Sequence, residues 1–336
     1  MSTLAQIARD LGLSKSTVSR ALRGKPGVSE ATVQTIREAA ERVGYIPSVT
    51  AAGLSTGRNE AIGVLVPSTN RWFYTTALSG VDRALAASGY DVVLFDLHYA
   101  SGSRRMFHKK LLRRRVDGLI VLSTEFDEIE YAQFATVGMP LIAVGGTVRR
   151  MPRIGIDDVE VARIATRHLL ELGHTRIGLV GGLDADGLNQ VVPIKRTDGW
   201  TLELRGAGAC IREDWMVEGG FRLPIAKQAV AELLDRVGED RPTALLCLSD
   251  EMAMGAILAI RDAGLRVPDD ISVIGIDGHP FAEAFGLTTC VQDAEAQGSL
   301  AAQTVLAQLQ DTTHRAVGRI TPFELTVRSS TSAPAV

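Results

Sequence analysis

The chain has 336 residues, 46% of them apolar and 22% charged, which fits two to three globular domains with sizeable cores and excludes a disordered chain. The net charge of −3 is unevenly distributed, because residues 1–58 carry eight Lys and Arg against four acidic residues, so a basic head precedes an acidic body. The amino terminus lacks a signal-peptide pattern and no apolar run approaches roughly 18 residues, so we expect a cytoplasmic protein that does not contact membranes.

The first predicted helix begins after Thr3, which stands three residues before Gln6 in the spacing of a capping box. Gly12 is expected to end this helix. The apolar positions repeat at the helical spacing i, i+3, i+4 and i+7 and are Leu4, Ile7, Ala8 and Leu11.

The second predicted helix runs from its N-cap Ser14 to Leu22, directly after the turn at Gly12, and a third begins after Ser29. Such a trio could be an ordinary set of surface helices. Residues 15–29 carry four basic side chains and no acid, however, and the outward face of the second helix is small, polar and basic. Such a face suits the major groove of DNA, so we expect a helix-turn-helix. The expected inward positions are Val18, Ala21, Leu22, Val33, Ile36, Ala40 and Val43.

From residue 61 onward, short β-rich runs alternate with amphipathic helical stretches, the pattern of repeated βαβ units. We therefore expect an α/β body of two doubly wound parallel-sheet lobes, with a ligand cleft at the carboxyl ends of the strands. The segment 321–336 is expected to be a frayed tail. The predicted strands are 61–66, 91–95, 118–122, 141–144, 177–180, 244–248 and 273–276, and the predicted helices are 78–88, 107–115, 162–172, 226–237 and 252–263.

Neither a metal site nor a catalytic centre is predicted. The three cysteines, Cys210, Cys247 and Cys290, are far apart and lack CxxC spacing, so they indicate buried thiols rather than a disulfide framework or a zinc site. The six histidines form no HxxxH or HExxH pair, and no GxSxG elbow occurs. We expect no cofactor and no enzymatic activity.

Several segments together resemble the lactose-repressor (LacI-type) family of transcription regulators, over nearly the whole chain. The resemblance implies a homodimeric repressor with paired heads on a pseudo-palindromic operator. It also implies a two-lobed body, similar to a periplasmic sugar-binding protein, whose small ligand changes operator affinity. The matching segments are Thr3–Ala8, Val18–Leu22, Val28–Thr32, Gly44–Pro47, Val116–Ile120, His168–His174, Ser249–Ala253 and Val267–Asp277.

In the head, the resemblance gives base-reading roles to Lys15, Ser16 and Arg20, and a guanidinium can bind guanine O6 and N7 together. Three further side chains are expected to contact phosphate oxygens, which position the head without reading sequence. These are Thr17, Ser19 and Arg23.

Residues 49–54 match the family's hinge helix, and Leu54 matches its minor-groove wedge. Ser48, Ala52 and Gly53 depart from the family pattern. Because glycine weakens a helix by roughly 1 kcal/mol relative to alanine, we expect a hinge that is disordered away from DNA.

In the cleft, the resemblance makes Arg196 the effector-binding arginine and Asp277 the acceptor of ligand hydroxyls, on opposing strand-end loops. Phe73, Tyr74 and Phe221 match positions that cover the ligand, although core packing would explain these aromatic side chains as well. Ser249 stands where the family has asparagine. The segments around Arg71 and Gly145 also depart from the family pattern, so the identity of the ligand cannot be transferred from a relative.

The predicted organisation is a helix-turn-helix head at 1–46, a hinge at 47–58 and a two-lobed effector-binding and dimerisation domain at 59–336. The predicted function is a DNA-binding repressor controlled by a small polyhydroxylated effector, a sugar or sugar derivative. Two alternatives stay open. One is a solute-binding protein, which would have no use for a basic helix-turn-helix, and the other is a regulator whose body docks a protein partner.

Overall fold

The computed structural model describes residues 4–22, 26–45, 58–97, 115–124, 138–146, 151–182, 190–311 and 315–335, together with residues 126, 132, 136 and 313. The chain divides into two compact units, residues 1–60 and 61–336, which we call the head and the body. Thr3, Arg23 and Leu54, nearly all of the predicted hinge and almost all of the predicted helix 107–115 lie outside the described residues.

The head is the predicted three-helix unit. Gly12 ends the first helix with a φ of +64°, in the left-handed region that glycine adopts without strain. The Ser29 hydroxyl accepts a hydrogen bond from the Thr32 N–H and caps the third helix, as predicted. Ile7, Val18 and Ile36 are fully buried at the centre of the small core. The helices are α1 (Leu4–Asp10), α2 (Lys15–Leu22) and α3 (Glu30–Arg42).

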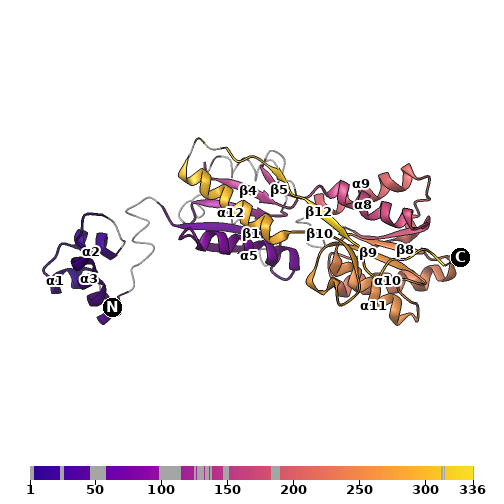
Figure 1. Ribbon diagram of the computed structural model, residues 1–336, viewed down its shortest axis with the longest axis horizontal. Helices are drawn as coiled ribbons and strands as arrows, with labels where there is room; N and C mark the ends of the chain where they lie inside the picture. The colour runs from indigo at the N-terminus through magenta and orange to yellow at the C-terminus, as the bar shows by residue number, and fades with distance from the viewer. Residues whose placement is uncertain are drawn as a thin grey trace. The chain divides into compact units, whose positions relative to one another are not determined.

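The body contains two six-stranded sheets, one in each lobe (Figure 1). The sheet of the first lobe is entirely parallel and has the order β11-β5-β4-β3-β1-β2. Its buried strands read as continuous apolar runs, as expected for strands that are covered on both faces. The strands are β1 (Ala61–Val66), β2 (Asp91–Asp96), β3 (Gly118–Leu122), β4 (Leu141–Val144), β5 (Arg153–Gly155) and β11 (Arg319–Ile320).

The second sheet has the order β12-β10-β9-β8-β6-β7, and only its edge pair β10 and β12 is antiparallel. The strands are β6 (Ile177–Gly181), β7 (Met216–Glu218), β8 (Ala244–Cys247), β9 (Ser272–Asp277), β10 (Thr288–Gln292) and β12 (Phe323–Thr326). Two parallel α/β lobes confirm the predicted fold class.

The helices of the body pack in pairs against the sheets: α5 with α12 in the first lobe, and α8 with α9 and α10 with α11 in the second (Figure 1). The chain crosses between the lobes three times, after β5, β10 and β11. Among the described residues, no helix is both long and apolar enough to span a membrane. The bounds are α5 (Trp72–Ala86), α8 (Asp158–Glu171), α9 (Val191–Gly206), α10 (Leu223–Val237), α11 (Asp250–Asp262) and α12 (Ala294–Gln310), with short 3-10 turns at Glu213–Trp215, Gly238–Asp240 and Pro280–Ala282.

The prediction of a frayed carboxyl-terminal tail is wrong. Residues 323–326 form strand β12, and the segment after it is tied to the second lobe. The Ser330 carbonyl accepts a hydrogen bond from the Val273 N–H at 2.8 Å, and the Ser332 carbonyl receives one from His174 Nε2, also at 2.8 Å. The small polar residues that suggested fraying are therefore hydrogen-bonding partners of the sheet.

Candidate functional site

The outward face of α2 is the candidate DNA-reading surface. The Ser14 hydroxyl accepts a hydrogen bond from the Thr17 N–H and also bonds the hydroxyls of Ser16 and Thr17, at 2.7 and 2.8 Å. Burial of Val18 and Ala21 against the head core turns the opposite side of the helix to solvent. Of the predicted contacts, Lys15, Ser16 and Arg20 are exposed, whereas Thr17 and Ser19 are half-buried.

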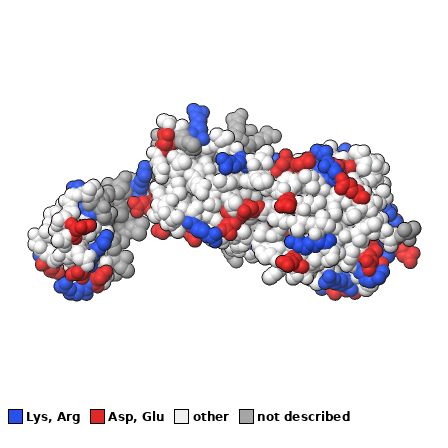
Figure 2. Space-filling view, viewed as in Figure 1, with Lys and Arg blue, Asp and Glu red and all other residues white. Residues whose placement is uncertain are grey.

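Arg20 projects from the last turn of α2 and donates a hydrogen bond from Nη2 to the Pro26 carbonyl at 2.8 Å. This bond holds the guanidinium beside the turn that precedes α3. A guanidinium carries five N–H donors, so a base edge can bond Arg20 without displacing this carbonyl. Figure 2 shows that basic and acidic side chains are interspersed over the visible face of the body, without one dominant sign.

The body holds a partly enclosed cleft with about 510 Å³ of space between its walls, including the part that is open to solvent. It is lined by all six side chains that the sequence predicted for the effector site: Phe73, Tyr74, Arg196, Phe221, Ser249 and Asp277. The other lining residues were not predicted as ligand contacts, although the sequence predicts that the strand-end loops starting at Pro67, Ser123, Gly145 and Ser249 rim the cleft, and these loops supply several of them. These other lining residues are Arg71, Ser123, Gly145, Ile156, Asp158, Val192, Glu251 and Gln292.

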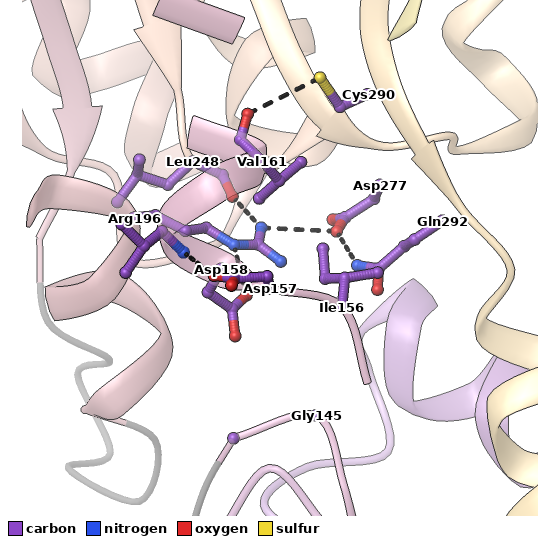
Figure 3. Close-up of polar contacts among 12 residues, drawn as sticks. Gly145, Ile156, Asp157, Asp158, Val161, Arg196, Leu248, Asp277, Cys290 and Gln292 are labelled. Atoms are coloured by element: carbon purple, nitrogen blue, oxygen red, sulfur yellow. Dashed lines mark hydrogen bonds and ion pairs between the residues drawn. The ribbon is translucent and has the colours of Figure 1, made fainter. Parts of the chain in front are cut away.

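Arg196 is at the centre of a buried polar network in the cleft (Figure 3). Its Nε donates to Asp158 Oδ1 at 3.1 Å, and its Nη1 donates to the Leu248 carbonyl and lies 3.6 Å from Asp277 Oδ1. Burial by itself would lower the pKa of Arg196, but Asp158 and Asp277 raise it overall, so the guanidinium stays charged.

The placement of Arg196 corrects one prediction, because this residue lies inside helix α9 and not on a strand-end loop. Helix α9 was hard to predict because Arg196 and Gly199 are buried while Ile194 and Leu202 are about half exposed. This is the reverse of an amphipathic pattern.

Asp277 ends strand β9 with a φ of +139° and accepts a hydrogen bond from Gln292 Nε2 at 2.8 Å. Burial raises the pKa of Asp277 to about 6, although Arg196 and Gln292 favour its charged form. Gln292 in turn accepts a hydrogen bond from Gln297 Nε2 at 3.0 Å. The carboxylate is therefore held in place from two sides and remains on the cleft wall as an acceptor.

Ser249 and Asp250 shape the cleft through the start of α11. The Ser249 hydroxyl caps this helix by accepting from the Met252 N–H at 3.3 Å. Asp250 accepts from the backbone N–H groups of Gly278 and His279 at 2.8 and 2.7 Å, and so fixes the loop after β9. Burial and repulsion from Asp277 raise the pKa of Asp250 to about 7.

Arg71 reaches from the first lobe to the second. It precedes α5, is 5% exposed, and its Nη2 lies 3.4 Å from the Gly220 carbonyl. Its guanidinium lies 5.8 Å from the centre of the Phe221 ring and 5.9 Å from that of Tyr74. The Phe221 ring thus contacts an arginine of the other lobe.

Glu251, in the first turn of α11, is a further polar group of the wall. The Trp72 backbone N–H of the first lobe favours the charged form of its carboxylate and so lowers the pKa of Glu251. Burial and repulsion from Asp277 raise the pKa of Glu251 to about 7, whereas Arg71 and Arg222 favour its charged form.

The two aromatic residues at the start of α5 differ in burial. Tyr74 is 4% exposed and belongs to the core of the first lobe, whereas Phe73 is half-buried, and their rings meet edge to face at 5.8 Å. Gly145 packs directly against Ser123 in this wall, and a Cβ there would lie 2.1 Å from Ser123 Oγ. Within the described part of the chain, no group of His, Cys, Asp or Glu is arranged to hold a metal ion.

Comparison with known proteins gives matches to both units. Residues 3–48 match the model of bacterial regulatory proteins of the lacI family, and residues 166–331 match a periplasmic binding protein-like domain. Among curated relatives, an HTH-type transcriptional repressor PurR from Aliivibrio salmonicida is 32% identical over 319 residues, which cover 94% of each chain.

Two solved structures are similar over nearly the full length. The lac repressor dimer bound to operator and the anti-inducer ONPF has a TM-score of 0.84 and 26% identity, and the match covers 99% of each chain. The complex of the transcriptional regulator CelR with cellobiose has a TM-score of 0.70 and 27% identity, with 98% of this chain and 100% of that chain covered.

Proposed function

The chain belongs to the lacI family of bacterial regulatory proteins and is a DNA-binding transcriptional repressor, and from this premise we propose that a small polyhydroxylated molecule, a sugar or sugar derivative, binds in its cleft. One observation carries the proposal: Arg196 and Asp277 place a charged donor and a charged acceptor 3.6 Å apart in the cleft wall. A sugar hydroxyl accepts and donates at once, so it satisfies both groups. The similarity to a cellobiose complex supports this class of ligand.

The head supplies the DNA-binding side of the same proposal. The exposed side chains of Lys15, Ser16 and Arg20 would read base edges in the major groove, and Thr17 and Ser19 would bond phosphates. Two chains would bind one pseudo-palindromic operator as a homodimer, and the body would act as a sensor without a catalytic step. Linkage makes the two effects equal: if the effector changes the affinity for operator by some factor, bound operator changes the affinity for the effector by the same factor.

A thermal-shift screen of monosaccharides, disaccharides, polyols, sugar phosphates and nucleosides tests the proposal, followed by calorimetry on two variants. Arg196→Ala removes charge-assisted hydrogen bonds, each about 1.5–3 kcal/mol, so it should weaken the ligand at least tenfold. Asp277→Asn should also weaken it while keeping the shape of the wall. Operator affinity without ligand should stay near that of the unmodified protein.

Arg205→Ala is the matched control, because Arg205 lies on the same helix α9 but is exposed and does not line the cleft. Its ligand affinity should equal that of the unmodified chain. A ligand that binds Arg196→Ala and Asp277→Asn as tightly as the unmodified protein would contradict the proposed site.

A further inference from the structure

We infer that the second lobe docks an extended segment of another protein, carrying apolar and cationic side chains, along the open edge of its sheet. The docking surface is a groove between helix α9 and strand β7, which we call the edge groove. The edge groove shares no lining residue with the effector cleft, so this inference goes beyond the proposed function and does not depend on it. Its lining includes Leu179, Ile194, Asp198, Met216, Val217 and Glu218.

Helix α9 turns an apolar side chain toward the edge groove. Ile194 lines the groove and is 49% exposed, whereas Arg196 is buried and lines the effector cleft. Across the groove, Met216 and Val217 of β7 are half-buried, and further along α9 the side chain of Leu202 is 55% exposed. A partner that removes these side chains from water gains free energy, which accounts for the inverted polarity of α9.

Strand β7 is the last strand of its sheet and pairs only with β6 among the described residues. Directly after β7, the Gly219 N–H donates to the Gly181 carbonyl of the β6 strand at 2.8 Å. Because successive residues of a strand turn their backbone groups to opposite sides, those of Met216 and Glu218 face away from β6. The Met216 N–H donates to the Glu213 carbonyl. The Met216 carbonyl and the Glu218 backbone groups therefore point to where an extended segment can add as a new strand.

The charged side chains that line the edge groove are both acidic. Asp198 of α9 and Glu218 of β7 are exposed, and neither forms an ion pair with another described residue. Among the described residues, no lysine or arginine lines the groove. A Lys or Arg of the partner would meet these carboxylates, which selects a cationic segment and orients it on the strand.

Two other kinds of occupant fit this charge pattern less well. A second copy of the chain, seated groove to groove by two-fold symmetry, would bring Asp198 and Glu218 of both copies together. Nucleic acid would bring its phosphates against the same carboxylates. A cationic extended segment meets neither repulsion.

The edge groove and the effector cleft lie on two sides of one helix. Val192 and Arg196 of α9 line the cleft, whereas Ile194 and Asp198 line the groove. A docked segment therefore leaves the cleft free for its ligand, and both binding events contact the same helix.

Selection from a peptide library tests the inference on the full chain. Random peptides of about twelve residues, displayed on phage, are selected on the unmodified protein and in parallel on the Asp198→Asn, Glu218→Gln double variant. We expect the sequences enriched only on the unmodified protein to combine apolar residues with lysine or arginine. One such peptide, made synthetically, should bind at least tenfold more weakly to the double variant and to Ile194→Ser, as measured by fluorescence anisotropy.

The matched controls alter the same residue types on helix α10 of the same lobe. Glu232, Asp235 and Ile225 are exposed and do not line the edge groove. Glu232→Gln, Asp235→Asn and Ile225→Ser should leave peptide affinity unchanged. A proline at the centre of the peptide should abolish binding, because it cannot donate to the strand ladder.

Two outcomes would overturn the inference. One is a selection whose peptides bind the double variant and Ile194→Ser as tightly as the unmodified protein. The other is self-association in sedimentation that Ile194→Ser abolishes, which would assign the edge groove to a second copy of the chain. Neither outcome bears on the effector, whose site is tested separately by Arg196→Ala.

Discussion

Arg20 is the residue whose loss should change which DNA sequence the protein prefers. In the structure its guanidinium is exposed on α2 and bonds the Pro26 carbonyl through Nη2, so its other N–H groups can bond a guanine edge. Arg20→Ala should cost roughly 1–3 kcal/mol at one base pair of each half-site and relax the preference there. Binding to randomised operators measures this effect.

The control for Arg20 is another exposed arginine of the head, Arg37 on α3. Arg37→Ala can weaken binding through phosphate contacts but should not alter the preferred sequence. An unchanged preference at every position in Arg20→Ala would show that α2 does not read bases through this side chain.

Glu251 should make the stability of the body depend on pH. Its folded pKa of about 7 lies above the unfolded value of about 4.3, so its contribution to stability is present in acid and is lost as the pH rises through about 7. The free energy of unfolding of Glu251→Gln, measured relative to that of the unmodified chain, should therefore increase between about pH 5 and about pH 8. Thermal unfolding measures it, and the exposed control Glu283→Gln should show no such trend.

At the scale of elements, helix pairs approach each other at glycines. A Cβ on Gly298 of α12 would lie 1.9 Å from the Ala77 carbonyl oxygen of α5, and neither backbone can yield without separating the helices. Gly298→Ala should therefore destabilise the body by about 1–3 kcal/mol or more, which is measured by denaturant unfolding.

Gly206 provides the matched control because it ends α9 with no atom within 4 Å of an added Cβ. Gly206→Ala should be neutral or stabilising by about 0.5–1 kcal/mol, since alanine favours the helix. Equal stability of the Gly298→Ala and Gly206→Ala variants would mean that α5 and α12 can shift apart freely.

At the scale of the whole molecule, we expect two chains on each operator. One head carries a single recognition helix of eight residues, which would bury too little DNA for tight specific binding. The footprint should therefore show two half-sites related by two-fold symmetry, and affinity should fall steeply with salt. Sedimentation that gives one chain per operator would contradict this.

The sequence by itself determined the elements whose signals are local. Caps such as Ser14 and Ser29 and the apolar runs of β1, β3 and β4 depend on a few neighbouring residues, so helices α2 and α3 and these strands appear where predicted. The family resemblance also singled out Arg196 and Asp277, which lie together in the cleft.

Only the tertiary structure decided which distant groups become partners. Arg71 and Glu251 are 180 positions apart; each follows the carboxyl end of a strand, but only the packing of the lobes brings both side chains to the same cleft. Helix α9 was not recognised in the sequence because it buries Arg196, which is the reverse of the usual amphipathic pattern. The carboxyl-terminal segment has the composition of a frayed tail, but β12 is ordered by pairing with β10. In each case the residues that come into contact lie far apart along the chain, so a short stretch of sequence does not contain both partners.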